Sequence, residues 1–179
     1  GLLAQALVNK FADHLPLYRQ EAIFGRAGVA IPRSTLAQWV GSCGVELQPL
    51  VDALKQDILR RSVIHADETP VQMLKPGHGK THRAYLWAYA AGAHEDIKAV
   101  VYDFCESRAG ANAKAFLHEW RGSLVVDDFS GYKQLMGDAS GQITEVGCWA
   151  HARRKFHDLQ LANQSQIAEQ AVRQIAQIY

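Results

Sequence analysis

The spacing of apolar residues changes near residue 61 and separates a helical opening from a part rich in expected strands. In the first 61 residues, apolar side chains recur every three or four positions, the period of one helix face. Helices are therefore expected over 3–11, 18–27, 32–40 and from 45 to about 61. Gly28 suits the tight turn between the second and third helices, and Ser34 or Thr35 can cap the third.

The second and third expected helices, joined by a turn at Gly28, have the outline of a helix-turn-helix. In that motif the second helix enters the major groove of DNA by its N-terminal residues. Here those residues are Arg33, Ser34 and Thr35. An ordinary helical hairpin packed on its neighbour would give the same pattern, so both interpretations stay open at this point.

From residue 62 onward, short apolar runs alternate with turns, which predicts strands. Strands are expected over 62–67, 84–91, 99–104, 124–127 and 143–147, helices over 108–120 and from 149 onward, a helical turn over 131–135 and a Gly-rich turn over 76–80. Trp149 and Phe156 are expected to pack the last helix on the sheet. The fold class is therefore mixed α/β, with a helical N-terminal region ahead of a mixed five-stranded sheet.

The composition allows one sizeable core and a small satellite domain, and the charge balance limits how the chain could bind nucleic acid. The 179 residues are 48% hydrophobic and 21% charged, and 19 Lys and Arg against 18 Asp and Glu give a net charge of +1. Any contact with nucleic acid must therefore come from local basic clusters. Cys43, Cys105 and Cys148 are odd in number and widely spaced, which gives no disulfide framework and suits a reducing cytoplasm. No apolar run approaches the roughly 18 residues of a membrane span.

Three short blocks carry the candidate chemistry: residues 65–70 (HADETP), 126–132 (VDDFSGY) and 147–156 (GCWAHARRKF). The first two each place a carboxylate at the end of a β-branched run, where a strand would deliver it to a shared cleft. Hard cations such as Mg²⁺ are usually held by one or two carboxylates together with substrate phosphates. The third block puts Arg153, Arg154 and Lys155 on an expected helix, as a phosphate-binding cluster or simply a solvated face.

Each acidic block offers two neighbouring candidates. Side chains alternate across a strand, so Glu68 points with Ile64 to the apolar side and Asp67 points the other way. Asp67 is therefore the better metal ligand. The second block offers Asp127 and Asp128, and any one of these acids could also be an exposed strand-end or helix-capping residue.

Taken together, these residues resemble the transposases of the insertion sequence 66 family, which are DDE enzymes built on the RNase H-like (retroviral integrase) fold. The resemblance covers nearly the whole chain, and it implies that the first and fourth strands lie side by side. It implies Asp67 as the first catalytic aspartate and Asp127 as the second, each also a ligand of Mg²⁺ or Mn²⁺. The family usually has a glycine after the second aspartate, so Asp128 stays open as a ligand or a repulsive neighbour.

Cys148 and His151 match a Cys-x-x-His signature that follows the second aspartate in this family. The two side chains lie on one face of an expected helix and could bind Zn²⁺. A structural zinc site normally needs four ligands, and the sequence offers no second Cys/His pair. A packing or DNA-facing role is therefore expected for both residues.

The resemblance implies an enzyme of DNA transposition and recombination that cuts transposon ends and joins them to target DNA by two-metal phosphoryl transfer. Its third acid, a glutamate, lies beyond an inserted helical region, so the chain is expected to be a fragment that stops before it and is inactive alone. The expected parts are a DNA-binding region (1–61), a partial RNase H-like core (62–148) and the helix leading into the inserted region (149–179).

The expected partner is double-stranded DNA, both transposon ends and target, bound by a homo-oligomer in the bacterial cytoplasm at the nucleoid, with no membrane. The DNA contacts are expected from Arg33, Ser34, Thr35, His151, Arg153, Arg154 and Lys155. Two alternatives are a non-catalytic DNA-binding module and a stand-alone RNase H-like nuclease. The nuclease would need its third carboxylate within this chain, where Glu169 is the only acid on the last helix.

Overall fold

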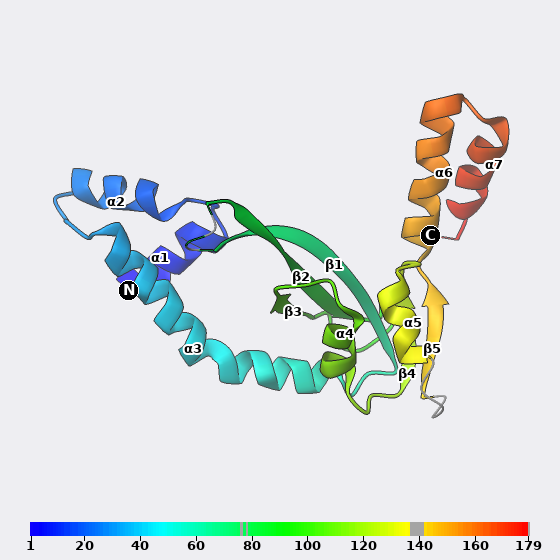
Figure 1. Cartoon of the computed structure of the whole chain (residues 1–179), viewed down its shortest axis with the longest axis horizontal. Helices are drawn as coiled ribbons and strands as arrows, with labels where there is room; N and C mark the ends of the chain where they lie inside the picture. Colours follow the sequence, from blue (N-terminus) through cyan, green and yellow to red (C-terminus); the bar gives the residue numbers. More distant parts are fainter. Residues whose placement is uncertain (76, 78, 137–141, 179) are drawn as a thin grey trace. The chain divides into compact units, whose positions relative to one another are not determined.

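The computed structural model describes residues 1–75, 77, 79–136 and 142–178, and Figure 1 traces its elements in chain order. These residues form seven helices and a five-stranded mixed sheet, which confirms the mixed α/β class. The chain divides into two compact units, Gly1–Ala53 and Leu54–Tyr179. None of the helices in the described part of the chain is long and apolar enough to span a membrane.

The N-terminal unit is helical, as the apolar spacing predicts. Its first two helices are α1 (Leu2–Phe11) and α2 (Leu17–Arg26). Gln20 of α2 is fully buried, and its side-chain amide donates hydrogen bonds to the carbonyl oxygens of Ala6 and Leu15 at 3.2 and 3.1 Å. This amide therefore ties α2 to α1 and to the turn between them.

The third helix, α3 (Arg33–Ile58), is one continuous helix where two were predicted. The break expected before Val45 is absent because apolar residues continue at helical spacing through Cys43 and Leu47. Pro49 lies inside the helix. The continuous apolar period therefore describes α3 better than two separate segments do.

The sheet has the strand order β3-β2-β1-β4-β5. β1 (Val63–Leu74) pairs antiparallel with β2 (Thr81–Ala91), which pairs antiparallel with β3 (Val100–Cys105). On its other side, β1 pairs parallel with β4 (Gly122–Val126), which pairs parallel with β5 (Ile143–Gly147). The first and fourth strands therefore lie side by side, which confirms the RNase H-like layout that the resemblance implies.

The hairpin of β1 and β2 is longer than predicted. The sequence pattern ends the first strand at Asp67, whereas β1 pairs with β2 as far as Leu74. Gly77 and Gly79, between the two strands, have φ angles of +85° and +65°, a region that glycine adopts without steric cost. Within the turn predicted over 76–80, residues 76 and 78 lie outside the described part of the chain.

The core lies between the sheet and two helices, α4 (Gly110–Leu117) and α5 (Ser130–Met136). Alternate residues of β1 are buried, so Ile64, Ala66 and Glu68 face this core. The core residues come from the strands, these two helices, the end of α3 and the segment between α4 and β4. They are Ile58, Ile64, Ala66, Trp87, Tyr89, Val101, Ala113, Phe116, Leu117, Trp120, Leu124, Val126 and Tyr132. This alternation leaves Asp67 on the other face of the sheet.

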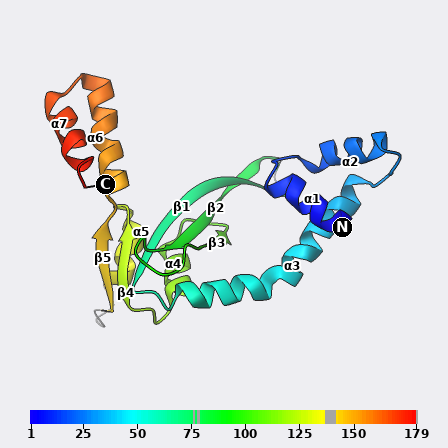
Figure 2. The ribbon, with the colours of Figure 1, turned by 180° about the vertical axis from the view of Figure 1, so that it is seen from behind.

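A helical hairpin follows β5, formed by α6 (Trp149–Asn163) and α7 (Gln166–Ile175) and seen from behind in Figure 2. The side chain of Ser165 caps the start of α7. The prediction that Trp149 and Phe156 pack α6 on the sheet is wrong, because their exposed fractions are 51% and 37%. Helix α6 packs against α7 instead.

Candidate functional site

The parallel pairing of β1 and β4 determines where the two predicted metal ligands lie. The register sets Ile64 beside Leu124, both fully buried. The same register, continued past the last paired residues, places Asp67 beside Asp127. If the alternation of β4 continues one residue beyond Val126, both aspartates are expected on the face opposite the core. The roughly 4 to 6 Å between carboxylates that share a metal stays a prediction.

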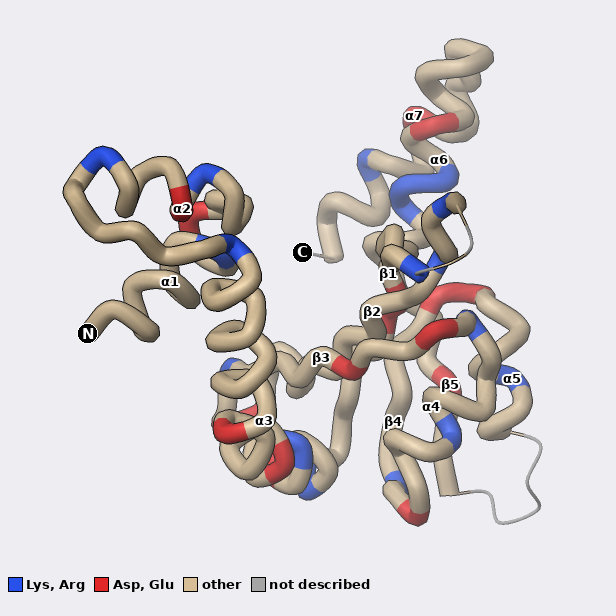
Figure 3. The backbone as a smooth tube through the Cα atoms, turned by 60° about the vertical axis from the view of Figure 1, so that its left-hand side comes forward, with Lys and Arg blue, Asp and Glu red and all other residues tan. Residues whose placement is uncertain are grey.

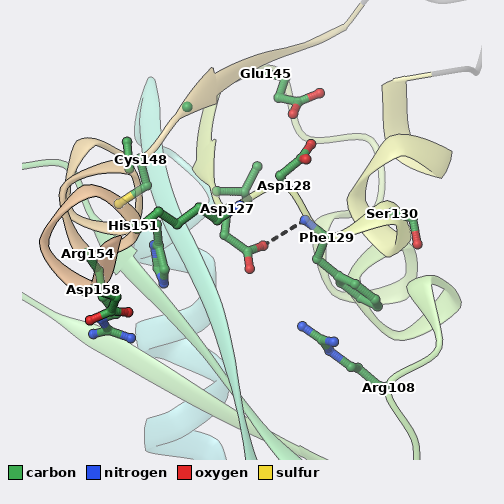
Figure 4. A pocket seen from close by; sticks show the side chains of 14 residues that line it. Arg108, Asp127, Asp128, Phe129, Ser130, Glu145, Cys148, His151, Arg154 and Asp158 are labelled. Carbon is green, nitrogen blue, oxygen red and sulfur yellow. Dashed lines mark hydrogen bonds between the residues drawn. The ribbon is translucent and has the colours of Figure 1, made fainter. Parts of the chain in front are cut away.

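Each aspartate is held by a backbone N–H group of its own segment. The Glu68 N–H donates to Oδ1 of Asp67 at 2.9 Å, and the Phe129 N–H donates to Oδ1 of Asp127 at 3.0 Å, the bond dashed in Figure 4. The Asp67 side chain is 54% exposed, and its Oδ2 lies 3.8 Å from Nε2 of His151. The backbone therefore fixes one oxygen of each carboxylate, and carboxylates have further lone pairs for a cation.

An open pocket of about 820 Å³ lies beside Asp127 (Figure 4). Its walls come from the segment before α4, the segment joining β4 to α5, β5 and α6. The lining residues are Arg108, Val126, Asp127, Asp128, Phe129, Ser130, Glu145, Gly147, Cys148, His151, Ala152, Arg154, Lys155 and Asp158. Five of the predicted residues thus share one pocket: Asp127, Cys148, His151, Arg154 and Lys155.

The start of α6 is tied to the end of β4, because the Cys148 N–H donates to the Val126 carbonyl oxygen at 2.9 Å. His151, one turn further, presents Nε2 toward Asp67, and its Nδ1 is buried without a hydrogen bond to any described residue. No group of three or more His, Cys, Asp or Glu side chains that could hold a metal ion occurs among the described residues. Cys148 and His151 therefore form part of the pocket wall, and their role in DNA contact stays a prediction.

Three of the basic residues predicted to bind DNA are exposed on α6: Arg153, Arg154 and Lys155. They form the blue segment of α6 in Figure 3. Arg154 and Lys155 line the pocket beside Asp127. Arg153 lies with Arg154 and His157 along a second pocket of about 540 Å³. Positive charge on α6 is thus available to both pockets.

Asp128, the open candidate in the second block, has a different environment from Asp127. Its side chain is 80% exposed and lies 3.3 Å from Nζ of Lys133. Lys133 also binds Glu145 at 2.5 Å, and the hydrogen bonds to Glu145 and then to Asp128 raise the pKa of Lys133 above its ordinary value. Lys133 therefore offsets part of the charge of Asp128 and shares its own charge with Glu145.

The prediction that Glu68 points to the apolar side of the sheet is correct, but its hydrogen-bond partners were not predicted. The Glu68 side chain is 1% exposed and pairs with Arg108, and the Tyr132 hydroxyl donates to it at 2.7 Å. Burial opposes the charge of Arg108, but the hydrogen bonds to Glu68 outweigh it and raise the pKa of Arg108. A buried carboxylate signals that some partner must exist. The sequence contains no signal for which residue that is.

The predicted DNA-reading residues lie in the first unit, at the start of α3. The prediction that Ser34 or Thr35 caps this helix is wrong, since the helix begins at Arg33, whose N–H donates to Oε1 of Glu21 at 2.8 Å. Gly28, with a φ of +80°, lies in the turn between α2 and α3. Arg33 and Ser34 are exposed and Thr35 is partly buried. The helix-turn-helix outline is therefore present, and its binding to DNA stays a prediction.

An RNase H-like sheet with aspartates on one face of its first and fourth strands is the arrangement that the resemblance to DDE transposases implies. The chain matches the family described as Transposase IS66 family over residues 1–179, and it belongs to that family.

The chain is also similar to three proteins of Sinorhizobium fredii (strain NBRC 101917 / NGR234), each named an uncharacterized protein. It is 41% identical to y4qI over 182 residues, which is 96% of this chain and 33% of that protein. It is 37% identical to y4jD over 187 residues, 100% of this chain and 37% of that protein. It is 31% identical to y4hP, over 89% of this chain and 30% of that protein. The chain thus spans about a third of the length of these curated relatives.

Proposed function

We propose that this chain supplies two aspartates, Asp67 and Asp127, that hold the catalytic metal ions of a transposase, together with surfaces that bind DNA beside them. The observation that supports the proposal is the parallel register of β1 and β4, which, if continued by two more residues, would bring Asp67 beside Asp127. Membership of the transposase family supports the general role. The basic residues that line the adjacent pocket support DNA as the substrate.

The donor atoms at this position suit Mg²⁺ or Mn²⁺. Both proposed ligands offer carboxylate oxygen, and hard cations are commonly bound by one or two carboxylates plus waters and substrate phosphates. Each carboxylate is oriented by a backbone N–H group, from Glu68 and Phe129. When bound, the metal would stabilise charge on the attacking and leaving oxygens of a phosphoryl transfer.

The residues around the aspartates bind and orient the DNA in this proposal. Arg154 and Lys155 line the pocket and neutralise phosphates on either side of the reacting one. Such contacts fix the position of the DNA but carry no base sequence. Base reading is assigned to the start of α3, where Arg33 and Ser34 are exposed.

The proposed partners are double-stranded transposon ends and target DNA in the bacterial cytoplasm, at the nucleoid. A transposon has two ends, and each needs its own pair of aspartates. We therefore expect the DNA-bound state to contain at least two copies of the protein.

The two alternative functions predict different behaviour for the isolated chain. A stand-alone nuclease would need Glu169 at the site, but Glu169 pairs with Arg173 within α7 and does not line the pocket. The residues of this chain offer two of the three acids that the resemblance implies. We therefore propose that the 179 residues bind DNA without cutting it, so that Mg²⁺-dependent cleavage lost in Glu169→Gln would favour the nuclease.

A titration of Mn²⁺, followed by the electron paramagnetic resonance signal of the free ion, tests the proposed ligands. Asp67→Asn and Asp127→Asn should each weaken binding by at least about tenfold, since even residues behind the ligands can have effects of that size. Asp128→Asn is the matched control and should keep the affinity of the parent chain, because Lys133 already offsets part of the charge of Asp128. Equal losses in all three variants, or no loss in the first two, would refute the assignment.

A further inference from the structure

A cluster of four side chains includes the neighbour of Asp67 in the sequence and reaches into the core, and the metal site as proposed does not use it. We call it the Glu68 cluster; its members are Glu68, Arg108, Phe129 and Tyr132. Both carboxylate oxygens of Glu68 are engaged within it. Oε1 accepts from Nε and Nη2 of Arg108 at 2.7 and 2.5 Å, and Oε2 accepts from the Tyr132 hydroxyl at 2.7 Å.

Aromatic contacts complete the Glu68 cluster. The guanidinium of Arg108 lies over the Phe129 ring, 3.7 Å from its centroid. Tyr132 meets the Phe129 ring edge to face, with centroids 5.9 Å apart, and meets Trp87 of β2 in the same way at 5.8 Å. The cluster thus joins β1, β2, the segment before α4 and the start of α5.

Two members of the cluster are also the residues whose backbone holds the aspartates. The N–H of Glu68 donates to Asp67, and the N–H of Phe129 donates to Asp127. Movement of either residue would therefore turn the carboxylate beside it. Arg108 also lies close enough to Asp127 for the charge of that aspartate to contribute to the raised pKa of Arg108.

Stability alone is a weak reason for burying this charge. Replacing a buried ion pair with well-packed apolar residues is often neutral or stabilising, because desolvation offsets much of the attraction. Here only the carboxylate is buried, since the side chain of Glu68 is 1% exposed and that of Arg108 is 43% exposed. The hydrogen bonds between them still fix geometry, because every hydrogen bond has a direction. Glu68 directly follows Asp67, and its side chain bonds to residues near Asp127. Fixing the position of Glu68 would therefore fix the orientation of both carboxylates.

We propose that the Glu68 cluster positions Asp67 and Asp127, with Glu68 and Tyr132 as positioning residues that fix the two N–H groups bonded to the aspartates. The inference rests on the proposed function only in taking the aspartates as metal ligands. Neither positioning residue touches the metal or DNA. Glu68 in particular is a support behind the ligand Asp67 rather than a ligand itself.

Hydrogen exchange of backbone amides, followed by NMR without metal or DNA, tests the positioning directly. Tyr132→Phe removes one hydroxyl and should speed exchange at the Phe129 and Glu68 amides by about five- to tenfold, the effect of losing one hydrogen bond. Tyr89→Phe is the matched control, because Tyr89 is equally buried in the same core and its hydroxyl bonds to no described residue. It should leave both amides unchanged.

A second control separates positioning from general loosening of the core. Trp120→Phe removes the hydrogen bond from Nε1 to the Arg61 carbonyl oxygen and should lower the melting temperature without affecting the two amides selectively. If Tyr132→Phe leaves the two amides unchanged, or if Trp120→Phe accelerates them equally, the proposal is overturned. If Tyr132→Phe does not fold, Glu68→Gln keeps the shape of the side chain and must accelerate the same two amides.

Mn²⁺ binding supplies a readout that a merely structural role would not move. Tyr132→Phe should weaken Mn²⁺ affinity by about tenfold, as loss of a supporting hydrogen bond behind metal ligands does, while Tyr89→Phe should not. Unchanged affinity in Tyr132→Phe would count against positioning. Absence of Mn²⁺ binding in the parent chain would instead refute the proposed metal site and leave the exchange result to decide the positioning of the aspartates.

Discussion

At the scale of single residues, Glu95 shows how a side chain from a loop fixes the start of β1. Its Oε1 accepts hydrogen bonds from the Ser62 hydroxyl at 2.9 Å and from the N–H groups of Ser62 and Val63 at 3.0 Å each. These bonds, led by the one from the Ser62 hydroxyl, lower the pKa of Glu95 below its ordinary value of 4.5. The charged form of Glu95 therefore stabilises the folded state.

This lowered pKa predicts a pH-dependent stability. Since the folded state binds the Glu95 proton less tightly than the unfolded state, the contribution is complete above about pH 4.5 and is lost as the pH falls through the lower, folded value. Glu95→Gln should therefore lower the melting temperature at neutral pH, and its difference from the parent chain should shrink in acid. Thermal melts from neutral pH into acid measure this, with the exposed Glu46→Gln as control; a difference that stays constant would contradict the account.

The alternation of side chains along β1 predicts the directions of Asp67 and Glu68 but not their contacts. The opposite directions of Asp67 and Glu68 follow from the period of two in β1, and the structure confirms that Glu68 is buried. The partner of Glu68 was not predictable, because Arg108 is 40 residues away and no local pattern connects them. The ion pair of Asp128 with Lys133 is likewise a contact made only by the folded chain.

At the scale of elements, α4 and α5 approach each other at two glycines. A Cβ atom added at Gly110 would lie 2.4 Å from the carbonyl oxygen of Gly131, and one added at Gly131 would lie 2.2 Å from the Phe129 ring. Backbone atoms cannot yield as a flexible side chain can. The close approach of the two helices therefore requires glycine at position 110.

Gly110→Ala should destabilise the chain by about 1 to 3 kcal/mol, the usual cost of overpacking. Gly147→Ala is the control in the same unit, because a Cβ there meets nothing within 4 Å, and it should change stability by less than about 0.5 kcal/mol. Urea unfolding of the two variants measures the difference. A Gly110→Ala chain as stable as the control would show that α4 and α5 are farther apart than the structure has them.

The elements themselves were largely predictable, since their order depends on local periodicity. The five strands are confirmed, and so is the pairing of β1 with β4, which the family resemblance rather than the local pattern implied. The continuity of α3 across residues 41–44 was missed. The length of β1 was missed because strand pairing with β2, which continues to Leu74, is a tertiary contact that the local pattern does not contain. The exposure of Trp149 was missed because the packing of α6 on α7 depends on the tertiary structure.

At the scale of the whole molecule, charge is nearly balanced, so any DNA binding must come from local clusters. We expect the chain to bind DNA weakly. A plot of the logarithm of the association constant against the logarithm of the salt concentration should have a slope of about −0.9 for each phosphate neutralised. Arg154→Ala should reduce that slope by about 0.9, while Arg121→Ala, an exposed arginine that lines none of the described pockets, should leave it unchanged. Fluorescence anisotropy measures the slope. Binding that is insensitive to salt, or equal effects of the two variants, would exclude α6 as the DNA-binding surface.

Anomalous diffraction from crystals grown with Mn²⁺ would show whether Asp67 and Asp127 share a metal ion. We expect an anomalous peak at about 2.1 Å from an oxygen of each aspartate, the distance expected for a small hard cation. The Asp127→Asn crystal should lose the peak, and the Asp128→Asn crystal should keep it. A peak held instead by Asp128 and Glu145, or two aspartate carboxylates too far apart to share one ion, would contradict the account.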